Sequence, residues 1–140
     1  MTAVHKTAAL KAPAQEVWSL IGGFNALPDW HPAVERSEER TEGPDRLRTL
    51  SLRGGGSIVE RLVKHDDQAR AYSYAIVSSP LPVENYRSEI RVRDDGDGRG
   101  CIVEWQSEFA PSGASEADAV AAIGGVYEAG LDNLRKRFGG

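Results

Sequence analysis

The sequence is poor in the features that mark secreted and membrane proteins. Its single cysteine, Cys101, cannot form a disulfide within the chain. No apolar run approaches the roughly 20 residues that a membrane-spanning helix needs. No charged segment followed by an apolar segment, as in a signal peptide, opens the chain. We therefore expect a soluble, cytoplasmic protein that makes no integral contact with a membrane.

Basic residues are also in deficit. The chain has 17 Lys and Arg against 21 Asp and Glu, which gives a formal net charge of −4. Residues of the two signs are interspersed along the chain, so no basic surface is expected that could hold a phosphate backbone. Nucleic acid is therefore not an expected partner.

Signals for a metal or a cofactor are missing as well. His5 and His65 are not spaced with carboxylates or Cys101 in the manner of metal ligands. The run Gly54-Gly55-Gly56 is not followed by the Lys-Ser/Thr pair of a phosphate-binding loop. We expect no metal and no cofactor. Cys101 is expected to be a small apolar residue, because no activating base can be placed beside it.

Repeats, low-complexity tracts and linkers are absent, so residues 1–140 are expected to form one domain. A chain of this length buries roughly two thirds of its unfolded surface, which is enough for a core without metal or disulfide support. The sequence does not indicate whether this domain is a monomer or a dimer.

A long helix is predicted from Ser115 to Gly140. Ser115 and Asp118 have the spacing of a capping box, in which each side chain bonds a backbone N–H of the first turn. The basic residues of the last turn suit the negative end of the helix dipole, and Gly139 can form the C-terminal cap. Apolar residues recur at steps of three and four and predict one buried stripe: Val120, Ile123, Tyr127, Leu131, Leu134 and Phe138.

Three glycines interrupt this helix, although each costs about 1 kcal/mol relative to alanine. Gly124, Gly125 and Gly130 have two interpretations. They can allow close approach to a sheet or a kink. Alternatively, the missing side chains leave room for a ligand beneath the helix.

Alternation of apolar and polar residues predicts strands over much of the remaining chain. Turn-forming residues separate them, so neighbouring strands are expected to be antiparallel. A short helix over Pro13–Ile21 and a one-turn helix within Phe24–Pro32 follow the first strand, and Val34–Glu39 is expected to be an edge strand. The other strands are predicted at Val4–Leu10, Leu47–Arg53, Ser57–Lys64, Ala71–Ser78, Tyr86–Arg93 and Cys101–Phe109.

The predicted inner face of this sheet mixes large aromatic rings with hydroxyl groups. A buried hydroxyl without a partner costs roughly 1–3 kcal/mol, so several together indicate either mutual hydrogen bonds or a wet, ligand-accepting cavity. Both interpretations stand at the level of sequence. The set comprises Tyr72, Tyr74, Tyr86, Ser88, Trp105 and Ser107 from the strands, and Tyr127 from the helix.

Glu60 and His31 are the candidates for proton transfer. Glu60 shares one face of its strand with Ile58 and Leu62, whereas Arg61 lies on the other face. If the Glu60 face is inward, desolvation raises the pKa of this carboxyl and makes it a possible acid or base. If the other face is inward, Arg61 is buried instead. His31 lies in a proline-flanked loop and is either a proton donor or acceptor, or a rim residue with a structural hydrogen bond.

The order of elements resembles the START-like (Bet v 1-like) helix-grip fold, and the motifs resemble the polyketide cyclase/dehydrase-like branch of the bacterial SRPBCC superfamily. This resemblance spans nearly the whole chain. It rests on Leu27-Pro28-Asp29-Trp30-His31-Pro32, Val59-Glu60-Arg61-Leu62, Tyr72-Ser73-Tyr74, Pro80-Leu81-Pro82-Val83 with Tyr86, Val103-Glu104-Trp105, and Tyr127 to Leu134.

The resemblance implies an α+β fold, in which a seven-stranded curved antiparallel sheet wraps around the C-terminal helix and two short helices follow the first strand. It also implies a cavity for a small hydrophobic, partly polar molecule. No catalytic set can be transferred, because members of the family include cyclases and carriers. The expected ligand-binding residues are Phe24, Trp30, Glu60, Tyr74, Tyr86, Ser88, Trp105, Ile123 and Tyr127.

Three functions are compatible with these observations. The first is a carrier or sensor of a lipid- or polyketide-like molecule. The second is a cyclase or dehydratase in which Glu60 or His31 moves protons. The third is a protein-interaction module, which ranks last because the predicted outer face is charged.

Overall fold

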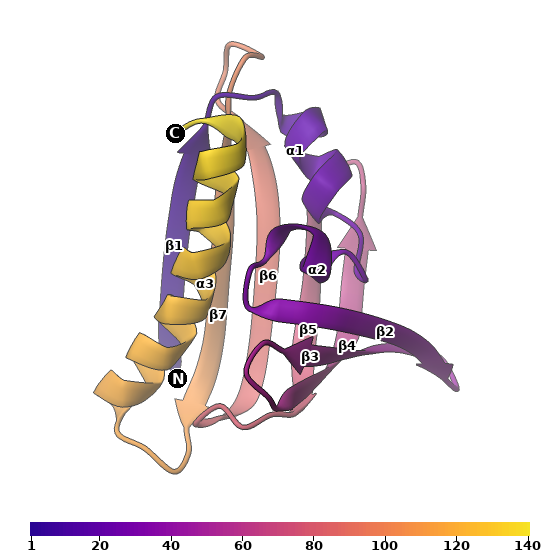
Figure 1. The fold of residues 1–140 in the computed structure, drawn as a ribbon, viewed down its shortest axis with the longest axis vertical. Coiled ribbons are helices and arrows are strands. Elements are labelled where there is room, and N and C mark those ends of the chain that lie inside the picture. The colour runs from indigo at the N-terminus through magenta and orange to yellow at the C-terminus, as the bar shows by residue number, and fades with distance from the viewer.

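A seven-stranded antiparallel sheet carries three helices on one face, and the computed structural model describes all of residues 1–140 (Figure 1). No helix has the length and apolar character needed to cross a membrane. The elements in chain order are β1 (Thr2–Leu10), α1 (Ala14–Ile21), α2 (Leu27–Trp30), β2 (Val34–Glu42), β3 (Asp45–Leu52), β4 (Ser57–Asp66), β5 (Ala71–Ser78), β6 (Val83–Asp94), β7 (Cys101–Pro111) and α3 (Glu116–Phe138).

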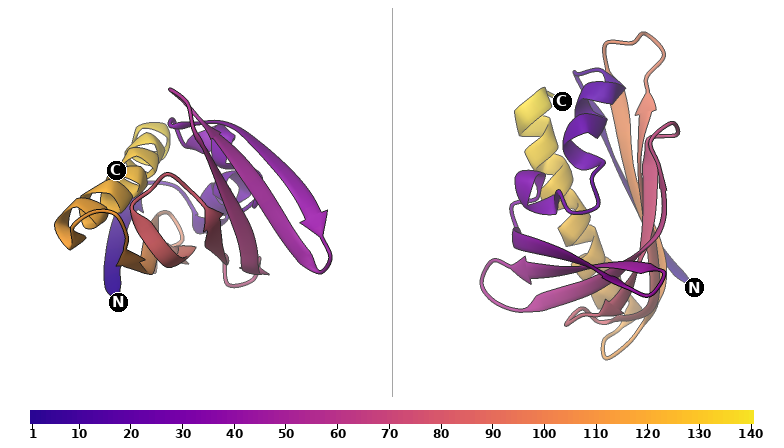
Figure 2. Two further views of the ribbon diagram at one scale, coloured as in Figure 1. Left: turned by 90° about the horizontal axis from the view of Figure 1, so that it is seen from below. Right: turned by 90° about the vertical axis from the view of Figure 1, so that its right-hand side faces the viewer.

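The strands lie in the order β1-β7-β6-β5-β4-β3-β2. Strands β2 to β7 form a meander, and β1 pairs with β7 so that Thr2 lies opposite Phe109 and Leu10 opposite Cys101. The sheet is curved, and α1, α2 and α3 all lie on its concave side (Figure 2). This is the α+β helix-grip arrangement predicted from the sequence, with β1 and β2 as its two edges.

Helix α3 begins and ends where the sequence predicted. Ser115 Oγ accepts a hydrogen bond of 3.1 Å from the backbone N–H of Asp118. The reciprocal bond of a capping box is not formed, because the aspartate side chain is one methylene shorter than the usual glutamate. At the other end the Gly139 N–H donates to the Arg135 carbonyl. The buried residues of the helix include Ile123, Tyr127, Leu131 and Leu134.

The three helix glycines have different surroundings. A Cβ atom on Gly130 would lie 2.8 Å from His31, 3.0 Å from Trp30 and 3.1 Å from Trp105. A Cβ on Gly125 would meet nothing within 4 Å. Gly130 thus allows close approach of α3 to the aromatic loop and to the sheet.

Two predicted strand boundaries differ from the structure by three residues, and several others differ by one or two. Strand β2 continues to Glu42, three residues beyond the predicted end, and only Gly43 and Pro44 form the turn, with Gly43 at φ +60°. Strand β6 already begins at Val83. In both cases hydrogen bonding to a neighbouring strand extends a segment whose sequence pattern is irregular.

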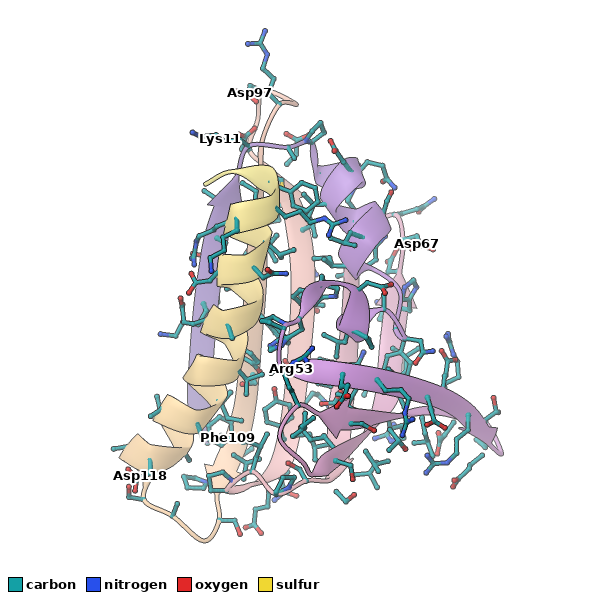
Figure 3. All side chains as sticks on the ribbon, in the orientation of Figure 1. Lys11, Arg53, Asp67, Asp97, Phe109 and Asp118 are labelled. Atoms are coloured by element: carbon teal, nitrogen blue, oxygen red, sulfur yellow. The ribbon has the colours of Figure 1, made fainter.

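The predicted inner face is confirmed along β6 and β7. Side chains from both strands alternate between buried and accessible, and Phe109 near the end of β7 is one of the buried ones (Figure 3). In β5, Tyr72 and Tyr74 are buried. The buried residues of the other two strands are Tyr86, Ser88, Ile90, Val92, Cys101, Val103, Trp105, Ser107 and Phe109.

Replacing Gly130 by alanine is expected to destabilise the protein by about 1–3 kcal/mol, although alanine is the better helix former. The added methyl group cannot fit between α3 and the rings of Trp30, His31 and Trp105 without displacing them. The free energy of unfolding from urea denaturation measures the effect.

Gly125→Ala is the matched control on the same helix. Gly125 is exposed and its Cβ position is open, so this variant is expected to gain up to about 1 kcal/mol. Equal stabilisation by the two substitutions would contradict the packing role of Gly130.

Candidate ligand cavity

A cavity of about 210 Å³ lies between the concave face of the sheet, the α2–β2 connection and α3. Of its 18 lining residues, 14 are hydrophobic. Arg53 is exposed and lies next to the start of β2, so it marks the side on which the cavity meets solvent (Figure 3). The lining residues with polar or aromatic side chains are His31, Arg53, Glu60, Tyr74, Tyr86, Trp105 and Tyr127.

The pairing of β3 with β4 determines which charge of β4 faces inward. Leu50 lies opposite Ile58, and Arg48 lies opposite Glu60. All four side chains are buried on the concave face, whereas Arg61 is half-buried on the other face. Glu60 is therefore the residue that reaches the cavity.

Arg48 holds Glu60 in a buried ion pair. Arg48 Nε donates to Glu60 Oε1 at 2.8 Å, and Nη2 lies 2.7 Å from the same oxygen. Arg48 Nη1 donates to the carbonyl oxygen of Phe24 and, at 3.3 Å, to the hydroxyl of Tyr72. The guanidinium also lies 4.4 Å from the centre of the Phe24 ring. One side chain thus connects β3, β4, β5 and the loop before α2.

Burial and charge act in opposite directions on this pair. Burial raises the pKa of the Glu60 carboxyl, and the attraction of Arg48 partly offsets that rise. Burial disfavours the charged form of Arg48, but attraction to Tyr72 and Glu60 outweighs it, so the pKa of Arg48 is raised and the guanidinium stays protonated. Both Arg48 contacts use Oε1 of Glu60, and Oε2 makes no hydrogen bond within the protein.

A chain of hydrogen bonds runs along the aromatic wall of the cavity. Trp105 Nε1 donates to the hydroxyl of Tyr74 at 3.1 Å. The Tyr74 hydroxyl lies 3.5 Å from that of Tyr86, which in turn is hydrogen-bonded to the hydroxyl of Tyr127. The Trp105 and Tyr127 rings stack at 4.4 Å between centres. The aromatic rings and the hydroxyl groups of the inner face therefore belong to one connected wall.

Ser88 ends this chain. Its Oγ lies 2.9 Å from the Tyr127 hydroxyl and donates to the carbonyl oxygen of Gln106 at 2.9 Å. Burial raises the pKa of Tyr127 to about 12 and raises the pKa values of Tyr74 and Tyr86 well above their usual range. All three phenols are therefore neutral at physiological pH.

His31 is buried, and both of its ring nitrogens have backbone partners. Nδ1 accepts a hydrogen bond of 3.1 Å from the Ala33 N–H, so Nε2 carries the proton and donates to the Val126 carbonyl at 2.7 Å. Burial lowers the pKa of the imidazole and keeps it neutral. This geometry fits the structural alternative for His31, since no ring nitrogen is free to transfer a proton.

Three of the expected ligand-binding residues do not line the cavity. Phe24 packs on the Arg48 guanidinium, and Trp30 fills the space between Trp105 and α3. Ser88 contacts Tyr127 but not the cavity itself. The lining does contain the other six expected residues, Glu60, Tyr74, Tyr86, Trp105, Ile123 and Tyr127.

Comparison with known proteins identifies the family. Residues 1–139 match the family described as polyketide cyclase / dehydrase and lipid transport. The chain belongs to this family. No match is found among curated protein sequences.

Solved structures of this fold include close and distant relatives. The protein XoxI from Bacillus cereus has a TM-score of 0.93 at 38% identity, with 99% of this chain and 96% of that chain covered. An uncharacterised protein from Bacillus thuringiensis has a TM-score of 0.92 at 37% identity, covering 98% of each chain. The Zhui aromatase/cyclase from Streptomyces sp. R1128 has a TM-score of 0.76 at 19% identity, over 97% and 92% of the two chains, and shares the fold alone.

Arg48 is the site residue of this family member that the sequence analysis missed. The sequence did contain a sign that Arg48 is buried. In the alternation Arg48-Leu50-Leu52, the arginine lies on the same strand face as two leucines. Leu47 lies on the opposite face of the same strand, so the pattern did not show which of the two faces is buried. A buried arginine opposite a buried glutamate becomes evident only when β3 and β4 are aligned.

Replacing Arg48 by methionine is expected to destabilise the protein by about 3–5 kcal/mol, because it leaves Glu60 as an unpaired buried carboxylate. Without Arg48 the folded-state pKa of Glu60 rises further. Above the unfolded pKa of about 4.3, the folded chain then holds a proton that the unfolded chain releases, so stability falls as pH rises. Urea denaturation between pH 4 and pH 8 measures both effects.

The double variant Arg48→Met/Glu60→Leu is the control. It removes both charges, so it is expected to recover most of the lost stability. Its free energy of unfolding should not fall with rising pH more steeply than that of the wild type. A single variant that loses less than about 1 kcal/mol and follows the wild-type pH curve would contradict the dependence of Glu60 on Arg48.

Proposed function

We propose that this protein binds a small hydrophobic, partly polar molecule in the cavity between the sheet and α3, and acts as its carrier or sensor. The supporting observation is the composition of the wall. Hydrophobic side chains make up 14 of 18 lining residues, and a hydrogen-bonded chain of phenols lies among them. This combination is typical of ligand pockets, in which a few placed polar groups orient an apolar molecule.

The cavity volume limits the ligand. An apolar cavity of about 150 Å³ is sufficient to bind benzene. At about 210 Å³ the present cavity is somewhat larger and opens toward Arg53. A compound with one or two rings, or an acyl chain of similar bulk, fits this volume. The family description, which includes lipid transport, supports the same ligand class.

Ile76→Trp is expected to abolish ligand binding, because Ile76 lines the cavity and the larger ring occupies it. The wild type should gain thermal stability with at least one member of a panel of lipids and aromatic polyketide-type compounds. The variant should show no gain with the same compounds. Differential scanning fluorimetry measures the shift, and isothermal titration calorimetry confirms the binding.

Val77→Trp is the matched control. Val77 is adjacent in sequence but 59% exposed and outside the cavity, so this variant should retain the ligand-dependent shift. Absence of a shift for every compound in the panel, or identical shifts for wild type and Ile76→Trp, would contradict binding in this cavity.

Glu60 favours a second candidate function, that of a cyclase or dehydratase. Glu60 is the carboxylate in the cavity lining, and its Oε2 has no partner in the protein. Burial raises the pKa of the Glu60 carboxyl toward the range useful for proton transfer. The tyrosine hydroxyls lie along the same wall, where they can bind a substrate oxygen-bearing group. The Zhui aromatase/cyclase shares this fold and is the precedent for such an activity.

If Glu60 is the acid or base, Glu60→Gln should lower turnover about 10²–10⁴-fold, because glutamine cannot exchange a proton. Incubation with aromatic poly-β-ketone and β-hydroxyketone compounds, followed by mass spectrometry, measures ring closure and loss of water. Glu89→Gln, on the outer face of β6, serves as the control and should leave turnover unchanged. Full turnover by Glu60→Gln would exclude this mechanism.

A protein-interaction function has less support. The exposed large hydrophobic residues are Met1, Val63 and Val77. Three such side chains do not make the large apolar patch that is typical of a protein interface.

A further inference from the structure

The hydrogen-bond chain in the cavity wall has a fixed direction. Ser88 has one hydroxyl hydrogen, and it is donated to the Gln106 carbonyl, which can only accept. The contact between Ser88 and Tyr127 must therefore use the hydrogen of Tyr127. By the same reasoning Tyr86 donates to Tyr127, and Tyr74 donates to Tyr86. Each phenolic hydrogen thus has an acceptor in the next member of the chain, and the contact from Tyr74 to Tyr86 is the longest of these at 3.5 Å.

The start of the chain agrees with this direction. The indole N–H of Trp105 can only donate, and its acceptor is the Tyr74 oxygen. The indole is thus also unavailable to a ligand. The phenolic oxygens can still accept hydrogen bonds, because each has used its hydrogen but keeps a lone pair.

The remaining polar groups of the inner wall follow the same pattern. Glu60 Oε2 has no partner in the protein and is an acceptor when the carboxyl is ionised, which is the form that the contacts with Arg48 stabilise. His31 Nε2–H is donated to Val126. Three buried nitrogen or oxygen atoms make no hydrogen bond, and all belong to residues outside the lining: Trp30 Nε1, Ser107 Oγ, and Arg48 Nη2, which has only its ion-pair contact with Glu60 Oε1. Uncommitted side-chain donors of the lining are found on Arg53, at the solvent side.

We propose that the inner end of the cavity accepts hydrogen bonds and donates none, so that it selects a one- or two-ring compound with a hydroxyl group at its buried end. This inference rests on the proposed ligand-binding function. A ligand hydroxyl replaces its lost water contacts by donating to Glu60 or to a phenolic oxygen. A carbonyl or ether oxygen at the same depth finds no donor and is left unpaired, which weakens binding.

Three compounds of similar shape test this polarity: 2-naphthol, 2-methoxynaphthalene and 2-acetylnaphthalene. Isothermal titration calorimetry of the wild type at pH 8 is expected to give at least tenfold tighter binding of 2-naphthol than of either acceptor-only compound. Equal affinities for the three compounds would overturn the proposed polarity but leave the cavity as a binding site. Failure of all three to bind would overturn the proposed selection of a one- or two-ring hydroxyl compound, whereas the binding function itself is decided by the panel of lipids and polyketide-type compounds.

Ser88→Ala tests the direction of the chain without altering the lining. Ser88 lies behind Tyr127, so its loss frees a phenolic hydrogen for the cavity while the cavity keeps its shape. Discrimination against 2-acetylnaphthalene is expected to fall to within about threefold, because a donor has become available to its carbonyl oxygen. Ser73→Ala, on the outer face of β5, should retain the wild-type discrimination.

A second substitution keeps this test decisive if Ser88→Ala folds poorly. Tyr74→Phe removes the acceptor of the Trp105 indole N–H, so that a residue of the lining gains an uncommitted donor. The preference for 2-naphthol over 2-acetylnaphthalene should again decrease. If folded Ser88→Ala or Tyr74→Phe protein keeps the full tenfold discrimination, the committed hydrogens are not its cause and the proposal is wrong.

Discussion

The buried ion pair between Arg48 and Glu60 is the interaction on which the architecture of the site depends. It joins β3 to β4 directly, reaches the loop before α2 through the Phe24 carbonyl, and contacts β5 through Tyr72. A slip of one residue between β3 and β4 would separate the two charges and turn one of them outward. The pair therefore makes one register much more favourable than its neighbours, and that register places a carboxylate in the cavity.

The features that could be predicted from sequence are those set by local patterns. The start of α3 at Ser115, its buried stripe, and the buried face of β6 and β7 follow from spacing along one segment. The helix-grip topology followed from the order of these segments and from short connections. Irregular segments such as the end of β2 were less predictable, because pairing with β3 rather than their own pattern determines where they end.

The site was harder to predict because it depends on alignment between strands. Strand β4 carries a charge on each face, so Glu60 and Arg61 were equivalent until the pairing with β3 was known. The role of the aromatic loop was ambiguous for a similar reason. Trp30 packs against α3 at Gly130 and does not line the cavity, whereas Trp105 and Tyr127 do. Only the three-dimensional arrangement separates rings that fill the core from rings that line a space.

The pairing of β1 with β7 has a consequence for the biosynthesis of the protein. Leu10 lies opposite Cys101, so the first strand has no partner until most of the chain has left the ribosome. The meander from β2 to β7 can form earlier, because each of its strands pairs with the next. Contacts between residues so far apart in sequence slow folding and leave strand edges exposed in the meantime. The nascent chain therefore holds an unpaired β1 and an uncovered concave face until β7 and α3 emerge, which is the period of greatest exposure to aggregation and to chaperones.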